Sequence, residues 1–111
     1  MDGFYAMYYT GAAGFGHAVF VLSDGILSGA DATGGILNGT YSITTSGSVD
    51  VDAHLSVPAG TTLVTGQNIP NDFVMDINTS LPRDFADGRV VSVTTSMGPV
   101  NVVFKMLRAL P

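Results

Sequence analysis

The stretch from Ser48 to Val57 alternates strictly between apolar and polar residues. A period of two places the two sets on opposite faces of an extended chain, as in a strand with one face in the core and one in water. The sequence therefore predicts an amphipathic strand here. Its apolar face carries Val49, Val51, Ala53, Leu55 and Val57, and its polar face carries Ser48, Asp50, Asp52, His54 and Ser56.

Seven further stretches rich in strand-forming residues are separated by Gly, Pro, Asn and Asp. Pro and Gly make residues 58–71 the longest irregular segment, with at most a brief extended piece at 62–65. Eight closely spaced strands in a single domain spanning residues 1–111 predict an all-β fold, either an antiparallel sandwich or a small barrel. The further predicted strands span residues 3–10, 15–22, 26–30, 37–44, 72–80, 89–95 and 100–107.

Four positions between or within these strands have predicted local roles. Gly after Asp tolerates the positive φ of a hairpin turn, so Asp24-Gly25 is expected to join two strands. Gly39 marks a bulge or a bend in its strand. Asp31 is expected to cap backbone amides in an Asx-type turn. Phe85 is expected to fill the underside of the loop at 81–88.

The first, second and last predicted strands are apolar on both faces. In a closed up-and-down barrel the last strand pairs with the first, so these three strands lie side by side and their outward residues form an apolar patch. Such patches usually mark interfaces, most simply of a homodimer; alternatively, some of these residues lie under the 58–71 segment as ordinary core. The outward set is either Tyr5, Met7 and Tyr9 or its alternate, joined by residues such as Phe20, Leu22 and Val103.

Charge is sparse and unevenly distributed along the chain. Charged residues make up 12% of the chain and the net charge is −5, and all four basic residues follow position 82. An acidic chain without a basic stripe is repelled by a phosphate backbone, so direct binding to nucleic acid is not expected. The negative charge instead favours solubility or a basic protein partner.

The compartment is predicted from what the chain lacks. There is no Cys, and therefore no disulfide framework. The first residues lack the positive region and the long apolar stretch of a signal peptide, and no apolar run is long enough to span a bilayer. We therefore expect a cytoplasmic protein with no membrane partner.

No group of residues predicts catalysis, a metal or a cofactor. The glycines at 11, 14 and 16 resemble a phosphate-binding loop, but a strand follows them where such a loop requires a helix, so we interpret them as turn glycines. Asp50, Asp52 and His54 share one strand face, as solvated residues of any half-buried strand do. His17 lies among apolar residues and is interpreted as a structural histidine. A small apolar ligand inside the barrel is the alternative, although the bulky apolar residues are enough to fill the interior.

The chain resembles the GrlR-type negative regulators, a family of small bacterial proteins associated with control of type III secretion. The resemblance implies an eight-stranded, lipocalin-like, up-and-down barrel that dimerises and restrains a transcriptional activator by protein contact, without touching DNA. The family's acidic surface motif alternates Glu and Asp. This chain has no Glu, so Asp50 and Asp52 resemble that motif only in part. The matching segments are Asp2-Gly-Phe-Tyr5, Gly14 to Leu22 with Asp24-Gly25 following, Gly29-Ala-Asp31, Thr33-Gly-Gly35, Gly39-Thr-Tyr41 and Gly98-Pro-Val100.

These observations lead to two hypotheses about function. The first is a non-enzymatic regulatory protein that dimerises and binds a protein partner, with the apolar set above as the interface and Asp50 and Asp52 as a candidate acidic surface for the partner. The second is a carrier of a small apolar molecule in the barrel interior. The second requires a continuous internal cavity of about a few hundred Å³ or more, whereas a solid interior filled by side chains would exclude it.

Overall fold

The computed structural model describes all 111 residues, which form eight β-strands and no helix. Every predicted strand is present, and its ends differ from the prediction by no more than two residues. Residues 62–65 do not form a strand; only an isolated bridge joins Thr62 to Asn68. The strands are β1 (Gly3–Gly11), β2 (Gly14–Ser23), β3 (Ile26–Asp31), β4 (Ile36–Ile43), β5 (Val49–Val57), β6 (Phe73–Leu81), β7 (Asp87–Thr95) and β8 (Gly98–Ala109).

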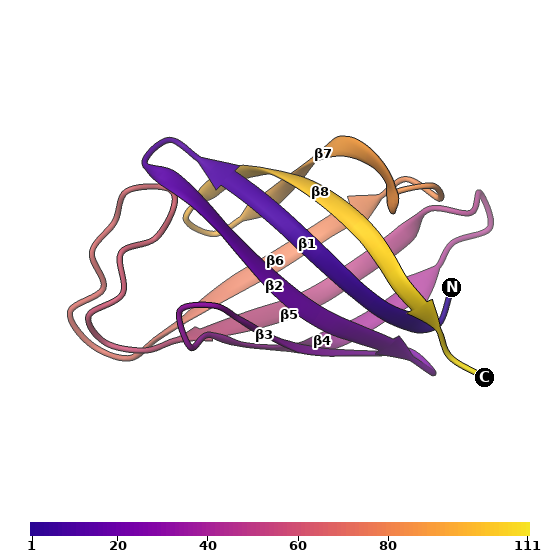
Figure 1. Cartoon of the computed structure of the whole chain (residues 1–111), viewed down its shortest axis with the longest axis horizontal. Helices are drawn as coiled ribbons and strands as arrows, with labels where there is room; N and C mark the ends of the chain where they lie inside the picture. Colours follow the sequence, from indigo (N-terminus) through magenta and orange to yellow (C-terminus); the bar gives the residue numbers. More distant parts are fainter.

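The strands pair in chain order, all antiparallel, and β1 also pairs with β8 (Figure 1). The fold is therefore a closed, lipocalin-like, up-and-down barrel, which confirms the predicted joining of the first and last strands. Closure gives each strand a neighbour on both sides. The weakest seam lies between β6 and β7, where Ile77 and Thr95 are the one aligned residue pair.

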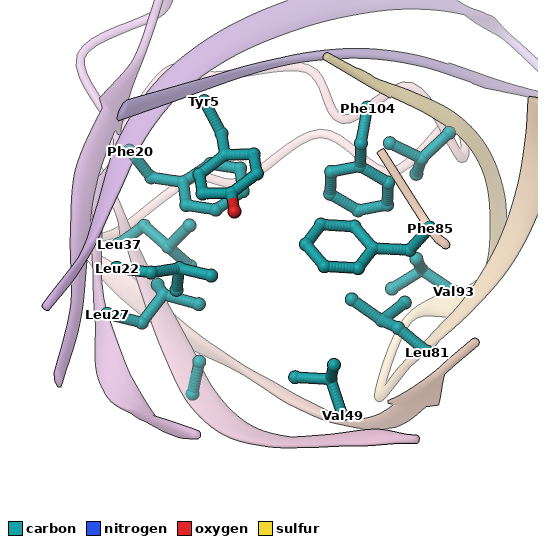
Figure 2. Packing of buried hydrophobic residues seen from close by; sticks show 12 residues of the cluster. Tyr5, Phe20, Leu22, Leu27, Leu37, Val49, Leu81, Phe85, Val93 and Phe104 are labelled. Carbon is teal, nitrogen blue, oxygen red and sulfur yellow. The ribbon is translucent and has the colours of Figure 1, made fainter. Parts of the chain in front are cut away.

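The inner face of the barrel holds a single apolar cluster. The most deeply buried aromatic ring is that of Tyr5, which stacks on Phe20 with ring centroids 5.3 Å apart. Figure 2 shows these rings and those of Phe85 and Phe104 converging from different strands and from the β6–β7 loop. The cluster comprises Tyr5, Phe20, Leu22, Leu27, Leu37, Val49, Ala53, Leu81, Phe85, Val93, Val102 and Phe104.

Of the two outward sets that the sequence left open on β1, the structure excludes Tyr5, Met7 and Tyr9. Phe20 and Leu22 of β2 also face inward, and only Val103, on β8, lies outward as predicted. Tyr5, Phe20 and Leu22 are buried in the core cluster, and Met7 and Tyr9 pack against it. Val103 lies between the inward residues Val102 and Phe104 and is partly exposed. Because side chains alternate along a strand, inward Tyr5 turns the alternate set of β1 outward. Both faces of β1 are apolar, so the alternation alone did not identify the inner one.

Two inward-facing glycines let the barrel curve around the large rings. A Cβ on Gly29 would lie 2.6 Å from the Cβ of Phe20, its cross-strand partner. A Cβ on Gly39 would lie 2.6 Å from the Cβ of Ala53. The β4–β5 register runs through Gly39 without a shift, so the predicted bulge is absent. Glycine is required here because neighbouring strands approach closely on the inner face.

The two ends of the barrel are closed differently. At the end that holds the chain termini, Phe85 of the β6–β7 loop is 2% exposed and packs on Tyr5 and Phe104, as expected from the sequence (Figure 2). At the other end, residues 58–72 form a long excursion between β5 and β6 that approaches the β1–β2 turn (Figure 1). The expected hairpin at Asp24-Gly25 is confirmed, with φ values of 51° and 81°.

Candidate functional site

The outer face of the barrel carries exposed apolar residues on β2, β1, β8 and β7, and His17, Lys105 and Arg108 lie among them. Phe4 pairs with Val21 of β2, and Tyr8 pairs with Val103 of β8, which pairs in turn with Val90 of β7. Tyr8, Val19 and Val90 are each at least half exposed. We call this surface the outer apolar face; its residues are Phe4, Tyr8, Val19, Val21, Val90 and Val103.

The opposite wall of the barrel is polar and acidic. Asp50 and Asp52 are exposed on the outer side of β5, as predicted, and β5 lies across the closed strand order from β1. His54 and Asp76 form the next outward pair between β5 and β6. No three acidic or histidine side chains come close enough to hold a metal ion. The apolar and acidic surfaces are thus separate, which leaves each free for a different contact.

A cavity of about 140 Å³ lies between the barrel interior and the 58–72 segment. We call it the mouth cavity. A second cavity of about 50 Å³ lies deeper and shares Met7, Leu37, Ile77 and Val93 with the first. Bulky side chains therefore fill most of the interior, as expected, and the mouth cavity is smaller than the few hundred Å³ expected for a carrier. The inner walls of the mouth cavity include Met7, Tyr9, Leu37, Leu55, Ile77 and Val102, and its cover consists of residues 61–65.

The polar lining of the mouth cavity consists of the Tyr9–Asp31 pair and of five threonines, at positions 33, 61, 62, 65 and 95. The Tyr9 hydroxyl donates to Asp31 Oδ2 at 3.3 Å, linking β1 to the end of β3. Burial, and then the Asp31 charge, raise the pKa of the Tyr9 hydroxyl far above its ordinary value of 10.0, so it stays protonated and remains a donor.

Asp31 also organises the β3–β4 turn, as predicted. Its Oδ1 accepts hydrogen bonds from the backbone amides of Thr33 at 3.0 Å and Gly35 at 2.7 Å, and from the Thr33 hydroxyl. A Cβ on Gly35 would lie 2.9 Å from Oδ1, so the missing side chain lets the carboxylate sit over the turn. The turn holds the carboxylate in one orientation, with Oδ2 directed to Tyr9.

Gly11 and Gly16 are not turn glycines, contrary to the interpretation from sequence. Neither has a positive φ. Gly16 pairs with Tyr9, and a Cβ on it would lie 2.7 Å from the Tyr9 ring. A Cβ on Gly11 would lie 2.5 Å from the carbonyl oxygen of Val64. These glycines make room for the Tyr9 ring and for the covering segment, respectively.

We call residues 58–72 the covering segment. Its base, where residues 60 and 69 are bonded, is held firmly, and its tip, around residues 64–67, is held loosely. Gly60 donates its amide hydrogen to Ile69 at 2.7 Å, Ile69 donates to Thr61, and the Ile69 side chain is buried. The tip is joined to the barrel by one backbone bond, from Ala13 to the Val64 carbonyl at 2.7 Å, and by a long side-chain bond of 3.4 Å from Gln67 to the Met97 carbonyl. Opening the tip therefore breaks few interactions.

Sequence reasoning missed two features and misjudged the position of His17. The first missed feature is the Tyr9–Gly16 pair. The sequence did contain a signal for it, because a two-residue turn at 12–13 in the β1–β2 hairpin places these residues opposite each other. The second is a hydrogen bond from the Tyr41 hydroxyl to the Asp2 carboxylate, which joins residues 39 positions apart and leaves no local signal. His17, interpreted from the sequence as a structural histidine, is exposed on the outer side of β2, opposite Tyr8.

The molecule has no helix of the length and apolarity that a bilayer crossing demands. Comparison with models of known protein families and with curated proteins found no match for this chain.

Proposed function

We propose that the protein is a non-enzymatic cytoplasmic regulator that acts by protein–protein contact and pairs with a second copy of itself through the outer apolar face. The exposed apolar side chains that neighbouring strands bring together, among them Phe4, Tyr8, Val19 and Val90, carry the proposal, because monomeric proteins rarely expose a large apolar surface. A two-fold contact places the same apolar face on both sides, so each copy covers the other. Lys105 and Arg108 of β8 pair with Ala6 and Phe4 of β1, so two positive charges lie within this surface.

The acidic wall at Asp50 and Asp52 is the proposed surface for the regulated partner. It lies across the barrel from β1, so pairing of two copies leaves it accessible. Its charge favours a basic protein surface. The resemblance to GrlR-type regulators supports a transcriptional activator as this partner, with type III secretion as the regulated process. The low content of basic residues supports restraint by protein contact without DNA binding.

Self-association is tested by sedimentation velocity on Val19→Asp, with Val74→Asp as the matched control. Val19 is 50% exposed within the outer apolar face, and Val74 is 54% exposed on β6, outside that face. The native protein and Val74→Asp are expected to sediment as dimers, and Val19→Asp as a monomer with an unchanged β-sheet circular dichroism spectrum. A monomeric native protein, or equal effects of the two substitutions, would contradict the proposed interface.

Partner binding is tested by affinity capture from the source cytoplasm with the native protein and with Asp50→Asn/Asp52→Asn. The native protein is expected to retain a transcriptional activator, and the double variant to lose it. The Val74→Asp protein controls for a general change in the surface. Equal recovery of the activator by the native protein and the double variant would contradict a role for the acidic wall, and recovery of no activator would contradict the regulatory proposal.

A carrier of a small apolar molecule is the second candidate function, favoured by the mouth cavity. A dry cavity of about 150 Å³ lined by apolar side chains is known to bind benzene, and the mouth cavity is of similar volume. A ligand that binds only the folded state stabilises it by RT ln(1 + L/Kd), where L is the free ligand concentration, so the unfolding temperature rises with ligand concentration. Benzene at increasing concentration is therefore expected to raise the melting temperature, and no rise up to its solubility limit would argue against a carrier.

A further inference from the structure

The two carboxylate oxygens of Asp31 have unequal surroundings. Oδ1 accepts three hydrogen bonds within the β3–β4 turn. Oδ2 accepts one, from the Tyr9 hydroxyl at 3.3 Å, which is long for a bond between a hydroxyl and a carboxylate. The salt bridges of the protein involve Arg89 with Asp84 and Asp87, so no cation neutralises Asp31. Oδ2 therefore retains the capacity to accept a strong hydrogen bond.

This oxygen belongs to a residue that lines a cavity whose other inner walls are mostly apolar. Asp31 and Tyr9 both line the mouth cavity, together with side chains such as Met7, Leu55 and Ile77. The volume of about 140 Å³ suits one small ring system and not a long acyl chain. A ligand that fills the space and matches its chemistry is flat, apolar and equipped with a single donor group.

We propose that the mouth cavity binds a small aromatic molecule with one hydrogen-bond donor, of the indole or phenol class, and that Asp31 Oδ2 accepts that donor. This inference rests on the second candidate function and specifies its ligand. Aromatic acids are excluded as ligands because the cavity lining contains a carboxylate and no basic side chain. Ring compounds without a donor bind more weakly, because they leave Oδ2 desolvated without a strong partner.

The mouth cavity is partly open to solvent, and the tip of the covering segment lies over the rest of it. Residues 61–65 cover the cavity, and two hydrogen bonds, to Ala13 and Met97, hold the tip on the barrel. The buried Ile69 side chain keeps the base in place. The tip thus acts as the lid of the site.

The ligand class is tested by isothermal titration with indole and with benzofuran. The two molecules have nearly the same shape, but indole donates through its N–H, whereas the benzofuran oxygen only accepts. Indole is expected to bind the native protein about tenfold more tightly, the effect of one hydrogen bond to a charged acceptor.

Two variants assign this preference to Asp31. Asp31→Asn keeps an oxygen for the turn amides and replaces Oδ2 by an amide donor, so the preference for indole is expected to disappear or reverse. Tyr9→Phe removes the hydroxyl that competes for Oδ2, so indole is expected to bind more tightly. Asp50→Asn on the outer wall is the control and should leave both affinities unchanged.

The outcomes separate this inference from the carrier function. Equal binding of indole and benzofuran, unaffected by Asp31→Asn, would leave a carrier but overturn the role of Asp31. Failure of indole, benzofuran and benzene to bind would overturn both. A preference for indole that persists in Asp31→Asn would place the acceptor elsewhere and also overturn the assignment.

The lid is tested by a reversible lock, Ala13→Cys/Gly66→Cys. A Cβ on Gly66 would lie 3.5 Å from the Cβ of Ala13, within the range that a disulfide spans. Gly66 has a φ of 107°, so the substitution strains the backbone, but the oxidised and reduced forms share this strain. Association of indole is expected to slow at least tenfold on oxidation and to recover on reduction. Equal association rates in the two forms would show that the tip is not the lid.

Discussion

The ring of Phe85 lies against the ring of Tyr5, with centroids 5.5 Å apart and planes tilted by 30°. Phe85 comes from the β6–β7 loop and also meets Phe104 edge to face at 5.2 Å. Phe85→Ala is expected to lower the free energy of unfolding by about 3–5 kcal/mol, because it leaves a void at this end of the barrel. Urea unfolding measures this change. Phe15→Ala is the control, since Phe15 is 84% exposed; similar losses in both variants would contradict the role of Phe85.

Gly29, the inward glycine of β3, is not expected to tolerate the addition of a methyl group. A Cβ at position 29 would lie 2.3 Å from the carbonyl oxygen of Val19, which belongs to the backbone and cannot rotate away. Gly29→Ala should therefore destabilise the protein by about 1–3 kcal/mol, the usual effect of overpacking. Gly14→Ala is the matched control within a strand, because nothing lies within 4 Å of its Cβ position. Equal midpoints of urea unfolding for the two variants would contradict this account.

Stability at low pH is expected to depend on Asp2. The hydrogen bond from Tyr41, and then that from the Asp24 amide, lower the pKa of the Asp2 carboxyl below its ordinary value of 3.8. A carboxyl whose pKa is lower in the folded state stabilises the protein above its unfolded-state pKa, and this contribution disappears as the pH falls through the folded-state pKa.

The Asp2→Asn variant should therefore be less stable than the native protein at neutral pH, and the difference should shrink as the pH falls below about 4. Urea unfolding between about pH 2 and pH 7 measures it. Asp52→Asn, on the exposed wall of β5, is the control. A difference that is constant over this pH range would indicate that Asp2 acts without titrating.

Stability at high pH is expected to depend on Tyr41. Burial, and then the bond to Asp2, raise the pKa of the Tyr41 hydroxyl above its ordinary value of 10.0. A raised folded-state pKa stabilises the protein below the unfolded-state value, and this contribution is lost as the pH rises through the folded-state value. Native and Tyr41→Phe proteins should thus converge in melting temperature above about pH 10. A gap that widens with pH would contradict the assignment.

The β6–β7 seam is expected to open more readily than the rest of the barrel. A single aligned residue pair joins these strands, whereas nine join β1 to β2. Native-state hydrogen exchange should therefore be faster for β7 amides directed to β6 than for β1 amides directed to β2. Comparable protection of these two sets of amides would contradict a weak β6–β7 contact.

The location of every strand could be predicted because alternation and turn chemistry are local. The β5 stretch has one apolar and one polar face, so its inner residues could be assigned from the sequence alone. The Asx-type turn at Asp31 and the hairpin at Asp24-Gly25 also involve neighbouring residues, and the structure confirms both.

The orientation of β1 and β2 could not be predicted in this way. Tyr5 and Phe4 are both apolar enough for the core, and only the barrel, with Gly29 opposite Phe20, places Tyr5 inside. Because Tyr5 faces inward, the proposed interface uses the alternate residues of β1 in place of Tyr5, Met7 and Tyr9.

The sequence by itself determined the strand positions, the turns and the acidic wall of β5, because each depends on residues close together in the chain. The tertiary structure decided which apolar face is buried, where Tyr9 meets Asp31, and that the segment after β5 covers a cavity. The physical reason is that these features depend on how strands distant in sequence pack around a closed barrel, where ring size and missing side chains must match across neighbouring strands.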